Sequence, residues 1–189
     1  MSNFTRNAII SSFLKLLDQR PLAKITIKDI VEDCGINRNS FYYHFRDIPA
    51  LLGEIVGEEI NRIISQYPTI DTLEAGIKIA VDFTLKNRRA VKHIYNSVNR
   101  DIFEDYMWRI CAYVTETVLR PEFAKHKISD ADKRLITRFL TCEVFGLIFG
   151  WLSEGMTEDI LKDSSRIFAL RKGMMEEMLC RCDPTSDKR

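Results

Sequence analysis

The sequence predicts an all-α protein. Apolar residues recur at spacings of three and four along most of its 189 residues. No stretch sustains the apolar/polar alternation of a half-buried strand, and the chain contains no Asn-Gly or Asp-Gly hairpin turn. We therefore expect helices joined by short loops, without a sheet.

The composition is that of a folded globular chain, with 46% hydrophobic and 29% charged residues. The net charge of +1 is unevenly distributed. Residues 1–46 contain seven Lys and Arg against four Asp and Glu, a net charge of +3, whereas the rest contains 21 against 23, a net charge of −2. Only the N-terminal part therefore has the positive bias that favours contact with phosphate groups.

The first predicted helix runs from Thr5 to Gln19 and ends before Pro21. It has one apolar stripe, which consists of Ile9, Phe13, Leu16 and Leu17. We expect this helix to cover the apolar faces of the two helices that follow.

Two short helices separated by a tight turn are predicted between Thr26 and Phe45. Thr26, with Asp29 three residues later, fits a capping box. Gly35 stands where a helix end needs a residue that tolerates positive φ, and Asn37 can cap the second helix. The two helices should therefore meet at a sharp angle.

The second of these helices has an outer face that is unusual for a solvated surface. Phe41 and Phe45 are four residues apart and face inward. The residues left outside are Arg38, Asn39, Tyr42 and Tyr43. An arginine fork can bind guanine edges, an asparagine amide can bind adenine edges, and tyrosine hydroxyls can bind phosphates. The alternative is a polar surface with incidental aromatic residues, and the motif favours DNA readout.

This stretch resembles the helix-turn-helix of the TetR/AcrR family of transcriptional regulators. The similarity extends roughly from Thr5 to Val56, and its core is the run GINRNSFYYHF from Gly35 to Phe45. The resemblance implies a sequence-specific DNA-binding regulator: a homodimeric repressor that a small molecule releases from a palindromic operator. The DNA-binding candidates are Thr26, Lys28, Asn37, Arg38, Asn39, Ser40, Tyr42, Tyr43 and His44.

Two positions in this stretch need separate comment. By its place in the motif His44 is expected to contact phosphate, with a structural histidine as the alternative. Ile48 stands where members of the family commonly have a lysine that helps to hold the DNA backbone. We therefore expect the next helix to be seated on the N-terminal domain by apolar contacts at its start.

A long helix is predicted from its cap, Asp47, to Tyr67. It is long enough to leave one domain and enter another. The predicted organisation is a three-helix helix-turn-helix domain over residues 1–47, a connecting helix over 48–67, and a C-terminal helical domain for ligand binding and dimerisation over 68–189.

The C-terminal domain should consist of helices and end in a frayed polar tail from Cys180. The helices are predicted around residues 77–85 and 91–95, from Asp101 to Pro121, from Ser129 to Glu154, and from Thr157 or Asp159 to Leu179.

The last two predicted helices carry more apolar residues than one packed face requires. Packing within one subunit explains this as well as a subunit interface does, and the resemblance favours a four-helix dimer interface. The candidates are Gly146, Gly150, Trp151, Ile167, Leu170 and Met174.

Aromatic residues of the C-terminal part are the candidates for ligand binding. At helical spacing such residues are more often core, and only the resemblance makes them candidates for a pocket whose ligand the sequence does not name. They are Phe83, Tyr95, Phe103, Tyr106, Trp108 and Tyr113.

An enzyme and a protein-binding helical adaptor are the alternatives from other classes. No catalytic residue is assigned, because the chain has no Gly-rich phosphate loop, H-E-x-x-H motif or nucleophile elbow. No metal or cofactor is predicted either. His93 and His126 are isolated, and Cys180 and Cys182 lack two further ligands nearby.

The expected location is the cytoplasm, without a membrane segment. Residues 1–20 do not form a signal peptide, and the longest apolar run, 144–152, is about half of the ~20 residues that cross a bilayer. The five cysteines, an odd number, are expected to be buried free thiols.

Overall fold

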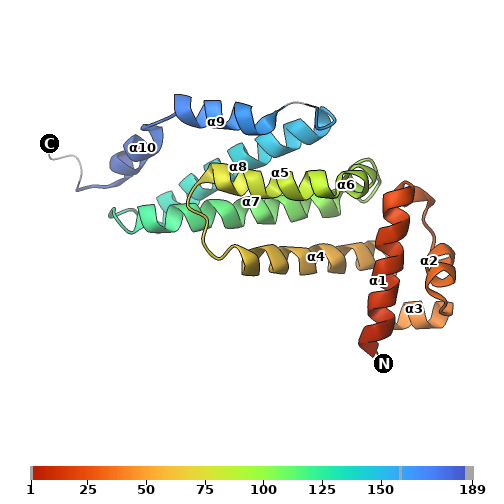
Figure 1. Ribbon diagram of the computed structural model, residues 1–189. Coiled ribbons are helices and arrows are strands. Elements are labelled where there is room, and N and C mark those ends of the chain that lie inside the picture. Colours follow the sequence, from red (N-terminus) through yellow and green to blue (C-terminus); the bar gives the residue numbers. More distant parts are fainter. Residues whose placement is uncertain (1, 158, 186–189) are drawn as a thin grey trace. The chain divides into compact units, whose positions relative to one another are not determined.

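The computed structural model describes residues 2–157 and 159–185, which form ten α-helices and one short 3-10 helix, with no strand among them (Figure 1). The predicted all-α class is confirmed. The chain divides into two compact units. The N-terminal unit comprises Met1–Ile63 and Thr84–Tyr106, and the C-terminal unit comprises Ile64–Phe83 and Met107–Arg189.

The N-terminal unit is built around α1, beside which α2 and α3 lie in Figure 1. Its elements are α1 (Ser2–Gln19), η1 (Leu22–Lys24), α2 (Ile27–Cys34), α3 (Arg38–His44), α4 (Ile48–Gln66) as far as Ile63, the end of α5 (Leu73–Lys86) from Thr84, α6 (Arg88–Tyr95), and the start of α7 (Arg100–Phe123) as far as Tyr106. The fully buried side chains come from α1 to α4 and include Ile9, Phe13, Leu17, Ile30, Phe41, Phe45, Leu51 and Leu52. The predicted inward face of the first helix is therefore confirmed.

Helix α6 also packs against α1. His93 Nδ1 lies 2.6 Å from the carbonyl oxygen of Leu17, so this nitrogen must carry the proton that it donates. Arg89 forms an ion pair of 3.5 Å with Asp18. His93 therefore has a structural part in joining two helices of this unit.

The C-terminal unit contains the remaining helices. They are α5 (Leu73–Lys86) as far as Phe83, α7 (Arg100–Phe123) from Met107, α8 (Asp130–Ser153), α9 (Ile160–Leu170) and α10 (Met174–Cys182). Helices α5 and α7 approach closely at Gly76, where a Cβ atom would lie 2.2 Å from Cγ1 of Val114. Only a glycine leaves room for Val114 at this crossing.

Two expected helix boundaries in this unit are wrong. Helix α7 continues through Pro121 to Phe123. Pro121 has no N–H to donate, but the helical hydrogen bonding resumes beyond it, where the N–H of Ala124 donates to the carbonyl of Arg120 at 3.3 Å. The expected last helix is two helices, because Gly173 adopts φ 87° between α9 and α10.

The expected frayed tail is also wrong for the described residues. Cys180 and Cys182 belong to α10, and Asp183 is buried behind it. The Asp183 carboxylate accepts the N–H of Lys127 at 3.0 Å and the N–H of Thr185 at 2.9 Å. The hydrogen bond from Lys127 fastens the end of α10 to the loop between α7 and α8.

Helix α8 is the one described helix that is long and apolar enough to cross a membrane by length and composition alone. Its buried residues recur every three or four positions and include Ile136, Leu140, Val144, Ile148 and Leu152. This pattern is that of a core helix packed in the C-terminal unit.

All five cysteines lie in the described part of the chain, and none of them forms a disulfide. Cys111 is buried, and this burial raises the pKa of its thiol to about 12. Cys142 is exposed on α8, and Cys34, Cys180 and Cys182 are only partly buried, so the expectation of buried thiols is confirmed for Cys111 alone.

Candidate nucleic-acid interface

Helices α2 and α3 form the predicted pair, and both predicted caps are present. Thr26 and Asp29 make a reciprocal capping box: the N–H of Asp29 donates to the Thr26 hydroxyl at 3.2 Å, and the N–H of Thr26 donates to the Asp29 carboxylate at 2.8 Å. Gly35 ends α2 with φ 71° and ψ 30°. The side-chain oxygen of Asn37 then accepts the N–H of Ser40 at 2.9 Å and starts α3. A glycine in left-handed conformation two residues before a new cap turns the chain sharply.

Polar contacts from α1 fix α2 in place, and the sequence did not reveal them. The buried hydroxyl of Ser12 donates to the carbonyl of Ile30 at 3.2 Å. Lys15 forms an ion pair of 2.6 Å with Asp33. Partners 18 residues apart in the chain come together only once the helices are packed.

The predicted outer face of α3 is exposed. Tyr42 is 54% exposed and Tyr43 is 78% exposed. The side chains of Arg38 and Asn39 are exposed as well, and neither bonds to a residue that the structure describes. A guanidinium, an amide and two phenol groups therefore stand on one short helix with their donors available for a nucleic acid.

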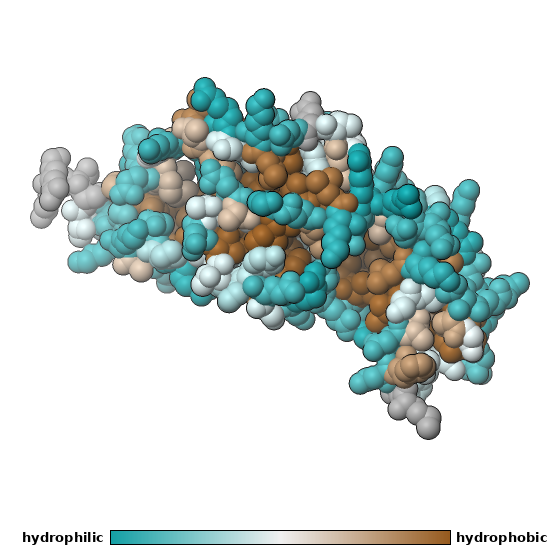
Figure 2. Space-filling model, in the orientation of Figure 1, coloured by the Kyte–Doolittle hydropathy of each residue, from teal (hydrophilic) through white to brown (hydrophobic). Residues whose placement is uncertain are grey.

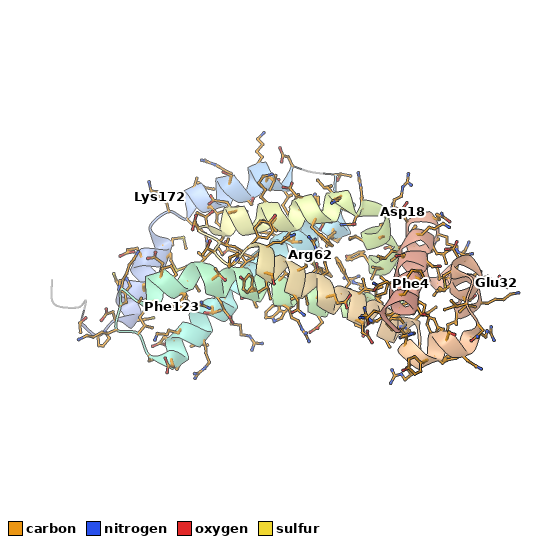
Figure 3. The ribbon with its side chains drawn as sticks, turned by 60° about the horizontal axis from the view of Figure 1, so that its bottom comes forward. Phe4, Asp18, Glu32, Arg62, Phe123 and Lys172 are labelled. Atoms are coloured by element: carbon orange, nitrogen blue, oxygen red, sulfur yellow. The ribbon has the colours of Figure 1, made fainter. Side chains whose placement is uncertain are left out.

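Two of the other candidates use their hydroxyl groups in the helix caps, and two do not. Thr26 donates its hydroxyl hydrogen to Asp29 at 2.6 Å, and Ser40 donates its own to Asn37 at 3.1 Å, so both hydroxyls serve the caps. Lys28 is exposed on α2 and lies 3.7 Å from Glu32, which Figure 3 labels. His44 is half-buried, with its ring 5.0 Å from that of Tyr43.

The capping box gives the N-terminal unit a measurable pH dependence. The hydrogen bond from the Thr26 hydroxyl, followed by that from the Thr26 N–H, lowers the pKa of Asp29 from 3.8 to about 2. A carboxyl group whose pKa is lower in the folded chain stabilises the fold above its unfolded pKa, and this contribution disappears as pH falls through the folded pKa. We therefore expect the difference in unfolding free energy between wild type and Asp29→Asn to be constant above about pH 4 and to shrink between pH 4 and pH 2.

Urea denaturation at stepped pH measures this difference. The Thr26→Val variant removes the main cause of the shift, so its difference from wild type should shrink over the same pH window. A difference between wild type and Asp29→Asn that stays constant down to pH 2 would contradict the prediction.

Arg6 on α1 binds two carboxylates of α4, which is a further contact that the sequence did not reveal. Its guanidinium lies 2.9 Å from Glu54 and 2.7 Å from Glu58, and 5.7 Å from the ring centre of Phe45. Ile48, at the start of α4, is half-buried. Arg6 therefore supplies an electrostatic attachment between α1 and α4 in addition to the expected apolar one.

The dimer candidates do not all lie on a surface. Trp151 is 5% exposed and belongs to the core of the C-terminal unit. Leu170 is 67% exposed and Met174 is 59% exposed, and Gly146 and Gly150 line a hollow of about 280 Å³ beside Ile167. Figure 2 shows hydrophobic side chains among hydrophilic ones on the surface of the C-terminal unit.

The ligand candidates are distributed over both units. Phe103 and Tyr106 are buried in the N-terminal unit, where Tyr95 lies under the guanidinium of Arg100 at 4.3 Å. The other three belong to the C-terminal unit: Phe83 is half-buried, Trp108 lines a groove, and Tyr113 donates a hydrogen bond to a main-chain carbonyl.

A helix-turn-helix with an exposed Arg-Asn-Tyr-Tyr face defines a DNA-binding protein of the regulatory class. Residues 9–55 match the family model for bacterial regulatory proteins of the tetR family. Residues 71–173, more than half of the chain, match the model for a transcriptional regulator C-terminal region. The chain belongs to the TetR family of transcriptional regulators.

Individual relatives match mainly the N-terminal part. The HTH-type transcriptional regulator EthR of Mycobacterium tuberculosis (strain ATCC 25618 / H37Rv) is 34% identical over 55 residues, which is 29% of this chain and 26% of EthR. EthR of Mycolicibacterium smegmatis is 26% identical over 91 residues, which is 48% of this chain and 39% of that protein. The chain thus spans less than half of the length of these curated relatives.

Solved structures show the same fold over nearly the whole chain. The dihydroxyacetone kinase operon activator DhaS has a TM-score of 0.66 at 19% identity and covers 94% of this chain and 96% of its own. NalD of Pseudomonas aeruginosa, described as the secondary repressor of a multidrug efflux pump, has a TM-score of 0.56 at 19% identity. The match covers 88% of this chain and 94% of NalD.

Proposed function

We propose that this chain is a homodimeric cytoplasmic repressor without catalytic activity. It binds a palindromic operator through α3 and is released by a small molecule bound in its C-terminal unit. The observation that carries the DNA-binding part is the exposed outer face of α3. Family membership supports regulation of transcription. The descriptions of the structural neighbours do not decide its sign, because NalD is described as a repressor and DhaS as an activator.

In a helix-turn-helix the second helix enters the major groove, with its first residues on base edges. Arg38 and Asn39 are the first two residues of α3, and Tyr42 and Tyr43 follow one turn later. We assign base readout to Arg38 and Asn39, and phosphate contact to the two tyrosines. Two such helices in a dimer would read half-sites about one helical turn apart, or somewhat more.

Arg38→Ala and Tyr42→Phe test these assignments. We expect Arg38→Ala to cost about 1–3 kcal/mol on the preferred site and to relax base preference at one position, because the fork binds one base. Tyr42→Phe should weaken binding to all sequences alike, since a phosphate contact carries no base identity. Selection from random duplexes followed by fluorescence anisotropy measures both effects.

The matched control for these variants is Arg166→Ala, an exposed arginine on α9. It should leave affinity and preference unchanged. If Arg38→Ala and Tyr42→Phe both have the DNA affinity and the preferred sequence of wild type, α3 is not the helix that contacts the DNA bases.

The dimer proposal predicts that Gly150→Leu weakens self-association at least tenfold. Apart from its own stretch of helix, a Cβ atom at Gly150 has no atom of its own protomer within 4 Å, so the new side chain should obstruct a partner and not the fold. Gly53→Leu on α4 is the matched control, because a Cβ there also meets no atom within 4 Å. Sedimentation velocity measures the monomer–dimer equilibrium. A monomeric wild type, or equal dimerisation of all three proteins, would contradict the proposal.

Release by a ligand requires a connection from the C-terminal unit to α3, and α4 supplies one along the chain. It begins at Ile48 in the N-terminal unit and ends at Gln66 in the C-terminal unit. Beyond that end, the Tyr113 hydroxyl on α7 donates to the carbonyl of Tyr67 at 2.9 Å. A ligand that favours a different position of α7 would thus act on α4, and by linkage operator DNA must weaken its binding by the same factor.

A further inference from the structure

A groove follows one side of the helix pair α7 and α8 in the C-terminal unit. It consists of two adjoining hollows of about 320 Å³ and 440 Å³, both bordered by Glu116, Lys133 and Thr137. Trp108 lines the first hollow and Phe123, labelled in Figure 3 on α7, lines the second. Each volume lies within the range of about 300–1,000 Å³ that is usual for small-molecule sites.

The charge of this groove is strongly positive. Four cations border it, Arg120, Lys133, Arg134 and Arg138, and Glu116 is the one carboxylate among its described lining residues. Of the four, Lys133 has a partner outside the lining, Asp130, at 3.3 Å. Arg134 and Arg138 lie one turn apart on α8 and border the same hollow as Trp108.

The three arginines of the groove have no ion pair with any residue that the structure describes. Other basic residues of the same unit do have one: Arg171 lies 2.6 Å from Glu143, and Lys125 lies 2.8 Å from Glu122. Unpaired guanidinium groups that share one hollow repel each other, and a bound anion would remove that repulsion.

The threonine hydroxyls of the groove already donate to main-chain carbonyls, so the arginines are the donors available to a ligand. The hydroxyl of Thr137 donates to the carbonyl of Lys133 at 2.8 Å, and that of Thr141 donates to the carbonyl of Thr137 at 2.8 Å. A guanidinium binds a carboxylate through two parallel hydrogen bonds, which gives orientation as well as affinity. Trp108, whose ring lies 5.6 Å from that of Phe145, offers an aromatic surface beside them.

We propose that the α7/α8 groove binds a small aromatic carboxylate, with the carboxylate on Arg134 and Arg138 and the ring against Trp108. The role of this groove as the effector site rests on the proposed function of the chain. Trp108 is one of the aromatic ligand candidates from the sequence, whereas the cations of the groove are not among those candidates. Lys133, Arg134 and Arg138 near the start of one helix, with Arg120 shortly before it, were the signal that could have been read.

Calorimetry with the full chain and without DNA tests the site. The probes are 2-naphthoate and 2-naphthamide, which share a ring system and differ in charge. Wild type should bind the acid at least tenfold more tightly than the amide, and Arg134→Ala/Arg138→Ala should bind the acid at least tenfold more weakly. The matched control is Lys162→Ala/Arg166→Ala, which removes two cations at the same spacing from the exposed face of α9 and should bind like wild type.

The site would be overturned by no binding of 2-naphthoate to wild type, by equal binding of acid and amide, or by an equal loss in both double variants. Circular dichroism and the melting temperature show whether each variant is folded. A folded groove variant with wild-type affinity for the acid would also overturn the proposal.

A second measurement separates the effector role from the proposed function. Operator affinity is measured by anisotropy with and without 2-naphthoate, and the anion should weaken DNA binding of wild type but not of Arg134→Ala/Arg138→Ala. Binding of the anion without any change in operator affinity would overturn the effector role. Loss of operator binding itself in the Arg38→Ala experiment concerns α3 alone and leaves the groove result intact.

Discussion

Replacing Phe41 by alanine should lower the free energy of unfolding of the N-terminal unit by about 3–5 kcal/mol and abolish DNA binding. Among the seven described residues of α3, Phe41 is the one that is buried, with none of its surface exposed. A helix this short is not stable by itself in water and depends on packing. The ring centre of Phe41 lies 5.9 Å from that of Phe45, so the truncation also leaves a cavity beside a second aromatic residue.

Tyr43→Ala, two positions along the same helix, is the matched control. Tyr43 is 78% exposed, so its removal should change stability by no more than about 0.5 kcal/mol while it weakens DNA binding. Urea denaturation followed by circular dichroism gives the stabilities, and anisotropy gives the DNA affinities. Wild-type stability and DNA affinity in Phe41→Ala would show that α3 is not held by this residue.

Replacing Gly76 by alanine should destabilise the C-terminal unit by about 2 kcal/mol net. The new methyl group would lie 2.2 Å from Cγ1 of Val114, well inside van der Waals contact, and overpacking of this kind costs about 1–3 kcal/mol, here at the upper end. Val114 has little freedom to turn away, because a β-branched side chain in a helix strongly prefers one rotamer. The higher helix propensity of alanine offsets about 1 kcal/mol of this cost.

A double-mutant cycle isolates the contact. If the methyl group and Val114 collide, Gly76→Ala/Val114→Ala should be more stable than the sum of the two single effects allows, because the second change makes room for the first. Gly57→Ala on α4 is the control, since a Cβ there meets no atom within 4 Å, and it should be neutral or stabilising by up to about 1 kcal/mol. Additive effects in the cycle would mean that α5 and α7 adjust without strain.

The DNA-binding motif could be read from the sequence because its determinants are local. Thr26 and Asp29 are three residues apart, as are Asn37 and Ser40, and Gly35 marks the turn by its own conformation. The outward side chains of α3 followed from the inward position of Phe41, which helical periodicity fixes.

Other features depend on partners far along the chain, and periodicity does not predict them. Arg6 and Glu54 are 48 residues apart, and Asp183 reaches the loop at Lys127 across 56 residues. The break at Gly173 was missed because apolar residues continue on both sides of it at helical spacing. The groove was missed because Trp108 on α7 and the two arginines on α8, Arg134 and Arg138, come together only in the folded unit.

The contacts of the Tyr113 hydroxyl with main-chain carbonyls at the end of α4 affect how a chimeric regulator should be built. Its hydroxyl donates to the carbonyl of Tyr67 at 2.9 Å and lies 3.4 Å from that of Ile64, so both acceptors are main-chain atoms that any residue at these positions would supply. A foreign DNA-binding domain joined upstream of Ile64 would keep both carbonyls whatever its sequence. One inserted residue within the helix would instead turn the segments on either side of it by about 100° relative to each other. The number of residues in α4, more than their identity, is therefore what such a graft has to preserve.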